Sequence, residues 1–285
     1  MSTSNELGAL ILSLPQRLGE HAPASDGYAR LKATARQLVE SLFSNPDENR
    51  DLPPFGRLVF PYFKMGVTDS LNLFDLDELI IFSFYWNNRE RYRRVLDIGA
   101  NIGAHSIILS RCGFTVRSYE PDPVHFEVLR QNLKSNDCTN VQAFNAAVSS
   151  RKGVFEFIRV LGNTTGSHIA GSKPNPYGQL ERFPVAAESI HDLIGWPDLI
   201  KMDVEGHEKE ILLETTPEHW SNMDALVEIG SESNAVAVFD HFNSMGVHLF
   251  SQKTAWRQVR GLADMPFSYR DGTLFVTHRA DMSWV

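Results

Sequence analysis

The sequence VLDIGANIG occupies residues 95–103 and carries the strongest indication of how the chain folds. An apolar run ends there in a turn with two glycines, and a segment of helical periodicity follows. Glycine has no Cβ and tolerates unusual backbone angles, so a turn built on Gly99 and Gly103 lets the backbone approach a ligand closely. A strand, a glycine turn and a helix in this order predict the first unit of a doubly wound α/β fold.

Downstream of this turn, short apolar runs alternate with helical segments, which is typical of a mainly parallel sheet. The pattern predicts a Rossmann-like domain over residues 93–285, with its ligand site at the carboxyl ends of the strands. The expected strands are residues 95–99, 116–120, 141–145, 199–203, 225–229 and 274–277. The expected helices are residues 103–112, 124–136, 207–214 and 234–245.

Two regions depart from this alternation. Residues 1–92 predict a mostly helical cap, with helices over 28–43 and 74–86 and a short strand over 56–63, and a flexible start before residue 28 stays open. Residues 153–184 begin with a strand and continue as a polar stretch rich in glycine and proline, which we expect to form a loop over the site. His168 lies in that stretch, among hydroxyl and amide groups suited to a polyhydroxyl acceptor.

Composition narrows the function classes. The formal net charge of −8 offers no broad basic field, so no nucleic-acid partner is expected. The longest apolar run, residues 79–86, is far shorter than a bilayer span, so no transmembrane helix is expected. Cys112 and Cys138 form no dense framework and suit a cytoplasmic location. A homo-oligomer stays open.

The chemistry of the first two strand ends favours a particular cofactor. The turn lacks the middle glycine of GxGxxG, and Asp97 would oppose a pyrophosphate but suit a cationic methionine group. This favours S-adenosylmethionine over NAD. Glu120 stands 17 positions after Gly103 and is the candidate for the ribose hydroxyls. Asp122 precedes a proline and is expected to cap the next helix.

Later strand ends supply the other candidates. Asn145 and Ala146 follow the third strand, where small side chains leave room for an adenine ring. Asp203, Glu205 and His207 follow a buried strand and are the candidates for a catalytic base. Glu228 near the end of the next strand would bring a third acid to the same rim, although the spacing demands no metal site.

These segments together resemble one known family. The stretches VLDIGANIG at 95–103, YEPDP at 119–123, NAAVS at 145–149 and IKMDVEGHEKE at 200–210 are similar to those of the FkbM family of S-adenosylmethionine-dependent methyltransferases. The resemblance covers residues 93–250 and implies a class I methyltransferase sheet of seven strands and O-methylation of a hydroxyl on a sugar, glycan or secondary metabolite. It places four groups of residues: Gly99, Ala100, Asn101 and Gly103 at the methionine end of the cofactor, Glu120 at the ribose, Asn145 and Ala146 at the adenine, and Asp203 and Glu205 beside the methyl group.

The sequence therefore predicts an S-adenosylmethionine-dependent O-methyltransferase that acts on a small-molecule or glycan acceptor without a bound metal. Two alternatives stay open. A nicotinamide-dependent oxidoreductase would share the first strand, turn and ribose acid. A methyltransferase-like fold that has lost its chemistry would serve as a binding module.

Overall fold

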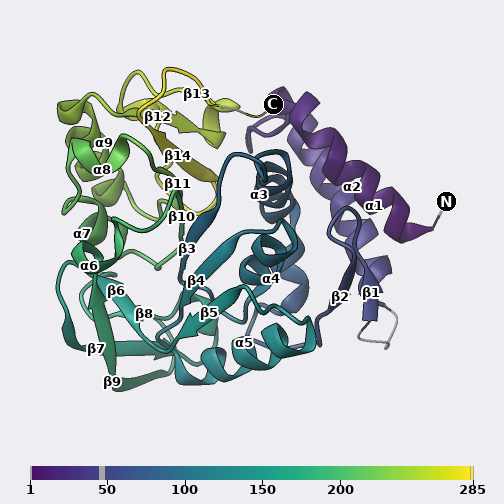
Figure 1. Cartoon of the computed structure of the whole chain (residues 1–285), viewed down its shortest axis with the longest axis horizontal. Helices are drawn as coiled ribbons and strands as arrows, with labels where there is room; N and C mark the ends of the chain where they lie inside the picture. Colours follow the sequence, from purple (N-terminus) through teal and green to yellow (C-terminus); the bar gives the residue numbers. More distant parts are fainter. Residues whose placement is uncertain (1, 45–48, 283, 285) are drawn as a thin grey trace.

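The computed structural model describes residues 2–44, 49–282 and 284. A large central sheet organises this part of the chain (Figure 1). Its eight strands run in the order β13-β12-β14-β11-β10-β3-β4-β5. Their bounds are β3 Arg94–Ile98, β4 Thr115–Tyr119, β5 Val141–Phe144, β10 Leu199–Met202, β11 Asp224–Glu228, β12 His248–Ser251, β13 Arg257–Gln258 and β14 Thr273–Thr277.

The sheet is mainly parallel, as predicted. Strands β5, β4, β3, β10 and β11 pair in parallel, and β14 runs antiparallel between β11 and β12. The doubly wound α/β class is confirmed. The seven strands that the family resemblance implies are all present. Strand β13 adds a two-residue edge strand, because the chain turns back beside β12 at residues 257–258. Sequence periodicity located six of these strands and missed β12 and β13.

Helices cover both faces of the sheet (Figure 1). The alternation of strand side chains explains why. Val95 belongs to the apolar core under α3, α4 and α5, whereas Leu96 belongs to the core under α6 to α9. The helices are α3 Leu76–Asn87, α4 Ala104–Arg111, α5 Pro123–Ser135, α6 Ile190–Leu193, α7 Glu208–Leu212, α8 Pro217–Trp220 and α9 Glu232–Met245.

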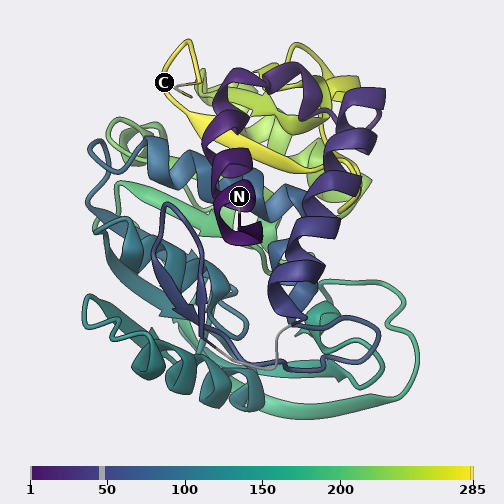
Figure 2. The same ribbon diagram turned by 90° about the vertical axis from the view of Figure 1, so that its right-hand side faces the viewer.

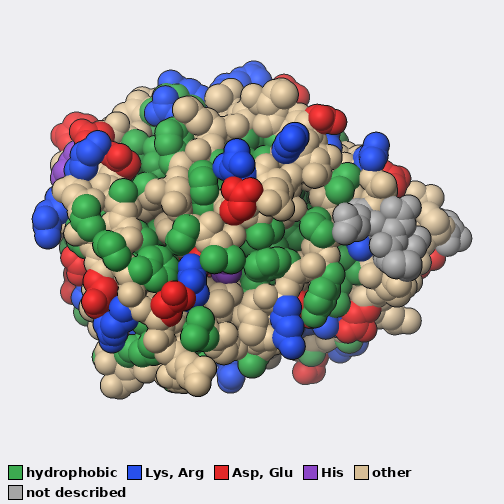
Figure 3. Space-filling view, turned by 90° about the horizontal axis from the view of Figure 1, so that it is seen from below, with side chains coloured by type: hydrophobic (Ala, Val, Ile, Leu, Met, Phe, Trp, Pro, Cys, Tyr) green, Lys and Arg blue, Asp and Glu red, His purple; other side chains and the backbone are tan. Residues whose placement is uncertain are grey.

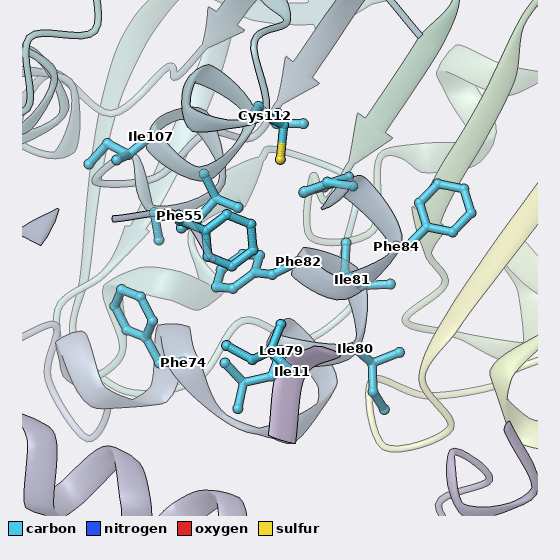
Figure 4. Close-up of a cluster of buried hydrophobic side chains, with 14 of the residues drawn as sticks. Ile11, Phe55, Phe74, Leu79, Ile80, Ile81, Phe82, Phe84, Ile107 and Cys112 are labelled. Atoms are coloured by element: carbon cyan, nitrogen blue, oxygen red, sulfur yellow. The ribbon is translucent and has the colours of Figure 1, made fainter. Parts of the chain in front are cut away.

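The N-terminal region packs on α3 through two further helices, α1 and α2, which lie in front of the sheet in Figure 2. The side chains of Ile11, Phe74 and Phe82 meet those of α4 in one cluster (Figure 4). The elements are α1 Thr3–Ser13, η1 Leu14–Gln16, η2 Leu18–Glu20, α2 Asp26–Phe43, β1 Asn49–Asp51, β2 Arg57–Val59 and η3 Ser70–Phe74.

The start of the chain is ordered by burial. Leu7 and Ile11 are completely buried and lie on one face of α1, so the flexible start left open before residue 28 is wrong. The missed signal was the apolar face of a short helix that begins at a Ser2 cap. The boundary near residue 92 stays a prediction, because one apolar core runs across it.

The segment expected as a loop over the site is instead part of a second sheet. Its strands, in the order β6-β9-β7-β8, are β6 Ala147–Ser149, β7 Gly153–Val160, β8 His168–Ile169 and β9 Leu180–Ser189. The long β7–β9 pairing buries Phe157 and Val185 and holds the turn η4 Thr164–Gly166 beside the main sheet. Residues 153–184 therefore cover the site as a small sheet with a connecting loop.

The remaining short elements are η5 Gln252–Thr254 and η6 Leu262–Asp264. No helix among the described residues has the length and apolarity needed to cross a bilayer. On the face seen from below, hydrophobic, acidic and basic side chains are interspersed (Figure 3).

Candidate functional site

A cleft opens at the carboxyl ends of β3, β4 and β10, where the topology predicts a ligand site. We call it the main cleft. The second sheet closes its other side. Its lining residues are Ile98, Gly99, Asn101, Tyr119, Glu120, Pro121, Asp122, His125, Ala147, Val148, Phe157, Thr164, Thr165, Ser167, His168, Ile169, Asp203, Val204 and Glu205.

The glycine turn after β3 brings two strand ends together. Gly99 has a φ of +80°, and a Cβ there would collide with the backbone carbonyl of Asp203. Asn101 also adopts a left-handed conformation, with a φ of +52°, and lines the cleft. Gly103 does not line it. A Cβ at Gly103 would meet the side chain of Leu129, so this glycine serves the packing of α4 on α5 and its predicted cofactor contact is not supported.

Glu120 joins the turn to the end of β4. Its Oε2 accepts a hydrogen bond of 2.8 Å from the amide of Asn101, and its Oε1 accepts one of 2.8 Å from the amide of Asp122. Burial raises the pKa of Glu120 to about 8, even though both amide donors favour the carboxylate. Ala100 is buried outside the cleft, and its amide donates to the Tyr119 carbonyl at 3.0 Å.

Asp122 has the capping role that the sequence predicts. Its carboxylate accepts the amide of Val124 at the start of α5. Arg159 from β7 donates two hydrogen bonds to the same carboxylate, at 2.6 and 2.7 Å, and so ties the second sheet to the main one. Burial opposes the charge on Asp122, but the Arg159 guanidinium holds its pKa below the usual value.

Asp203 and Glu205 face the cleft from the end of β10. Asp203 Oδ1 is buried without a hydrogen-bond partner among the described residues. Glu205, at a φ of +57°, forms an ion pair with Lys173, and the side chain of Tyr269 lies beside its carboxyl group. Burial raises the pKa of Glu205 to about 7, and the charge of Asp203 acts in the same direction. Lys173 and Tyr269 were not predicted, because both lie in loops that carry no pattern.

Asp97 lies beneath the glycine turn. It is completely buried, and its Oδ2 accepts a 2.6 Å hydrogen bond from Ser106 Oγ. The ammonium of Lys201 lies 3.7 Å from its Oδ1 and donates to the carbonyl of Gly99 at 3.1 Å. Asp97 does not line the main cleft, and its predicted contact with a cationic ligand stays a prediction. Asp97 belongs to a buried pair that supports the turn, because the strand's alternation points its side chain inward.

His207 also has a structural place. Its Nε2 lies 2.9 Å from Ser149 Oγ and its Nδ1 lies 2.9 Å from Ser172 Oγ, so both ring nitrogens are engaged. It is buried outside the residues that line the main cleft. The ring joins the second sheet to the loop before α7, and the geometry does not favour His207 as a base.

The residues predicted for the adenine lie two positions before the residues that line this wall of the cleft. Asn145 is exposed and uses its amide to donate to the carbonyls of Glu120 and Pro121, at 2.9 and 3.1 Å. Neither it nor Ala146 lines the cleft. Ala147 and Val148, the next residues along the chain, do. The sequence placed small residues at this wall but could not fix the bend between β5 and β6.

A second cleft lies on the other side of Asp203. Glu78 of α3 and His105 of α4 meet there, with Glu78 Oε2 2.7 Å from His105 Nε2, and His105 Nδ1 is 3.0 Å from the Tyr85 hydroxyl. No sequence pattern predicted a role for Glu78, His105 or Tyr85. The lining residues are Asp77, Glu78, Ile81, His105, Lys201, Met202, Asp203, Leu226, Glu228, Tyr269, Gly272 and Thr273.

The family model described as "Methyltransferase FkbM domain" matches residues 97–243. This match spans the ends of β4, β10 and β11, which carry the predicted acids. The chain belongs to the FkbM methyltransferase family, and its sheet is that of a class I methyltransferase.

Individual relatives are more distant. The chain is 29% identical to methyltransferase sdnD of Sordaria araneosa over 44% of this chain and 61% of that protein. It is 30% identical to hexuronic acid methyltransferase AglP of Haloferax volcanii over 47% of this chain and 54% of that protein. The matches thus cover about three fifths or less of these relatives. A solved FkbM methyltransferase from Methylobacillus flagellatus KT aligns with 94% of this chain and 60% of its own, at 14% identity and a TM-score of 0.40.

The close contact at Gly99 generates a stability prediction. Gly99→Ala adds left-handed strain, roughly 1–2 kcal/mol, and a collision with the Asp203 backbone, about 1–3 kcal/mol more. Gly56→Ala is the matched control, because Gly56 has a φ of +76° with open space around its Cβ position. Denaturant unfolding should show a clearly larger loss for Gly99→Ala. Equal losses of stability in the two variants would mean that the ends of β3 and β10 can move apart at no cost in free energy.

Proposed function

We propose that the chain is an S-adenosylmethionine-dependent methyltransferase that transfers the methyl group to a hydroxyl of a small-molecule or glycan acceptor. The observation that carries this is the geometry of Glu120. Its carboxyl group lines the main cleft while two backbone amides fix both of its oxygens. A carboxyl group held in this way is preorganised to accept the two hydroxyls of a ribose.

The residues of the main cleft fit the cofactor. Asn101 Oδ1 and Asp203 Oδ1 are buried and have no hydrogen-bond partner within the described chain, so donors from a ligand would satisfy them. Ala147 and Val148 supply a small apolar wall for the adenine base. When bound, S-adenosylmethionine supplies a methyl group on a positively charged sulfur, and the carboxylates at the end of β10 favour positive charge nearby.

The chain's own part in the reaction is to align the acceptor hydroxyl and to remove its proton. Asp203 is the strongest candidate for the base, because it lines both clefts and one of its oxygens is unpartnered. Glu205 is paired with Lys173 beside Tyr269 and is the weaker candidate. Both nitrogens of His207 are engaged, which argues against it.

The name of the Haloferax relative refers to a hexuronic acid, which supports a sugar-type acceptor here. The interspersed surface charges and the net charge of −8 argue against nucleic acid. The two cysteines are free and buried, which supports a cytoplasmic location. No group of three or more His, Cys, Asp or Glu residues suited to a metal occurs in the part of the chain described, and independence from metals stays a prediction.

The alternatives receive less support. An oxidoreductase that binds a dinucleotide needs close backbone approach at the middle glycine, where this chain has Asn101 in a left-handed conformation. An inactive binding module would have no need of an unpartnered Asp203 oxygen between two clefts.

Glu120→Ala tests the ribose contact. We expect it to weaken S-adenosylmethionine binding by roughly 1–3 kcal/mol, because the ligand hydroxyls lose a buried partner. Isothermal titration calorimetry measures the change. Glu127→Ala, an exposed acid on α5, is the control and should bind like the unmodified chain. Equal affinity in both variants would remove Glu120 from the cofactor site.

A comparison of Asp203→Asn, Glu205→Gln and His207→Ala tests the base. Asp203→Asn should lower kcat by ~10²–10⁴ with nearly unchanged cofactor affinity, because only proton removal is lost. Glu205→Gln should lower kcat less, and His207→Ala should lower thermal stability more than kcat. Turnover against a working acceptor gives the three values. Loss of turnover in the histidine variant alone, with a normal melting temperature, would make His207 the base.

A further inference from the structure

His168 of β8 is a buried side chain whose ring orientation is fixed. It is 1% exposed, and its Nδ1 lies 3.0 Å from the carbonyl oxygen of Gly166. A carbonyl only accepts hydrogen bonds, so Nδ1 carries the proton and donates. Burial lowers the pKa of His168, which favours the neutral ring. Nε2 is then an unprotonated acceptor.

This acceptor has no partner among the described residues. His168 Nε2 is buried, yet no protein donor lies within hydrogen-bond distance of it. A buried acceptor without a donor is unfavourable, and such an atom in a cleft indicates that a ligand supplies the donor. His168 lines the main cleft, on the wall that the second sheet contributes.

The neighbouring walls of the cleft suit a flat ring. Phe157 and Ile169, which pair across β7 and β8, are buried and apolar. Val148 and Tyr119 bring further apolar surface from β6 and β4. In such an apolar pocket, the His168 Nε2 acceptor can form a hydrogen bond with a donor on the edge of an aromatic heterocycle. The faces of the heterocycle then pack against apolar side chains.

We propose that His168 Nε2 accepts a hydrogen bond from the exocyclic amino group of adenine and thereby selects an adenine nucleoside in the main cleft. The inference rests on the proposed function, in which Glu120 holds the ribose in the same cleft. An acceptor hydroxyl is the rival donor. It is disfavoured because the second cleft lies beyond Asp203 and offers separate room for the acceptor.

The test compares two ligands that differ at the amino group. S-Adenosylhomocysteine carries the donor, whereas S-inosylhomocysteine carries a carbonyl oxygen there, which would face the Nε2 lone pair. Calorimetry on the unmodified chain should show a preference for the adenosyl ligand of ~10-fold or more, the size expected when a buried polar group loses its partner. Equal affinities would overturn the proposal.

Variants at position 168 test whether His168 causes the preference for the adenosyl ligand. His168→Leu should bring the two affinities within about twofold, mainly through loss of adenosyl binding, because both ligands then meet hydrocarbon. His168→Gln keeps an acceptor oxygen and should retain part of the preference. His278→Leu, at an exposed histidine after β14, is the control and should leave the preference unchanged.

The results distinguish failure of the His168 proposal from failure of the proposed function. An undiminished preference in His168→Leu would overturn the role of His168. Unchanged binding of both ligands with lost methyl transfer in that variant would assign Nε2 to the acceptor hydroxyl and contradict the adenine contact. Absence of S-adenosylhomocysteine binding to the unmodified chain would contradict the proposed function itself. If His168→Leu does not fold, the two-ligand comparison on the unmodified chain and on His168→Gln still decides.

Discussion

The carboxyl group of Glu120, clamped between the amides of Asn101 and Asp122, is the contact on which the rest of the site depends. Two loops that follow different strands meet at this one side chain. A third strand end joins them where the backbone of Asp203 presses against Gly99. Because these contacts use backbone atoms, they place the loops with little freedom, and the cleft is largely formed before any ligand enters.

The family-matched residues and the segments outside the match contribute different side chains to the two clefts. The family-matched residues 97–243 supply the turn, the clamp and the acids, whereas the N-terminal helix α3 sends Glu78 to the second cleft beside Asp203. Tyr269, near the other end of the chain, reaches the same cleft. We infer that the shared half of the chain serves the cofactor and that segments outside the family match shape the space for the acceptor.

Much of the fold followed from periodicity. The strands of the main sheet alternate between two cores, and this alternation is visible in the sequence as apolar runs with helical segments between them. In the second sheet, the sequence predicted only the strand that begins residues 153–184, which is β7. Strand β9, residues 180–189, carries polar and charged side chains on an exposed face, and only pairing with β7 makes it a strand.

The site could be predicted where functional side chains come directly after a strand in the sequence. Gly99, Glu120, Asp203 and Glu205 lie in the cleft as the sequence indicated. Asp97 and Gly103 do not line the cleft, because a motif does not state which of its members face the ligand and which support the turn. His168 lines the cleft from strand β8, and Lys173 in the loop after β8 pairs with Glu205, so local sequence could not predict their contacts.

The most direct test is a crystal structure of the chain with S-adenosylhomocysteine. We expect both ribose hydroxyls within hydrogen-bond distance of the Glu120 carboxyl group, the adenine base against Ala147 and Val148, and the sulfur on the side of Asp203. The Asn101 and Asp122 amides should keep their bonds to Glu120. A ligand bound elsewhere, or a ribose that does not contact Glu120, would contradict this expectation.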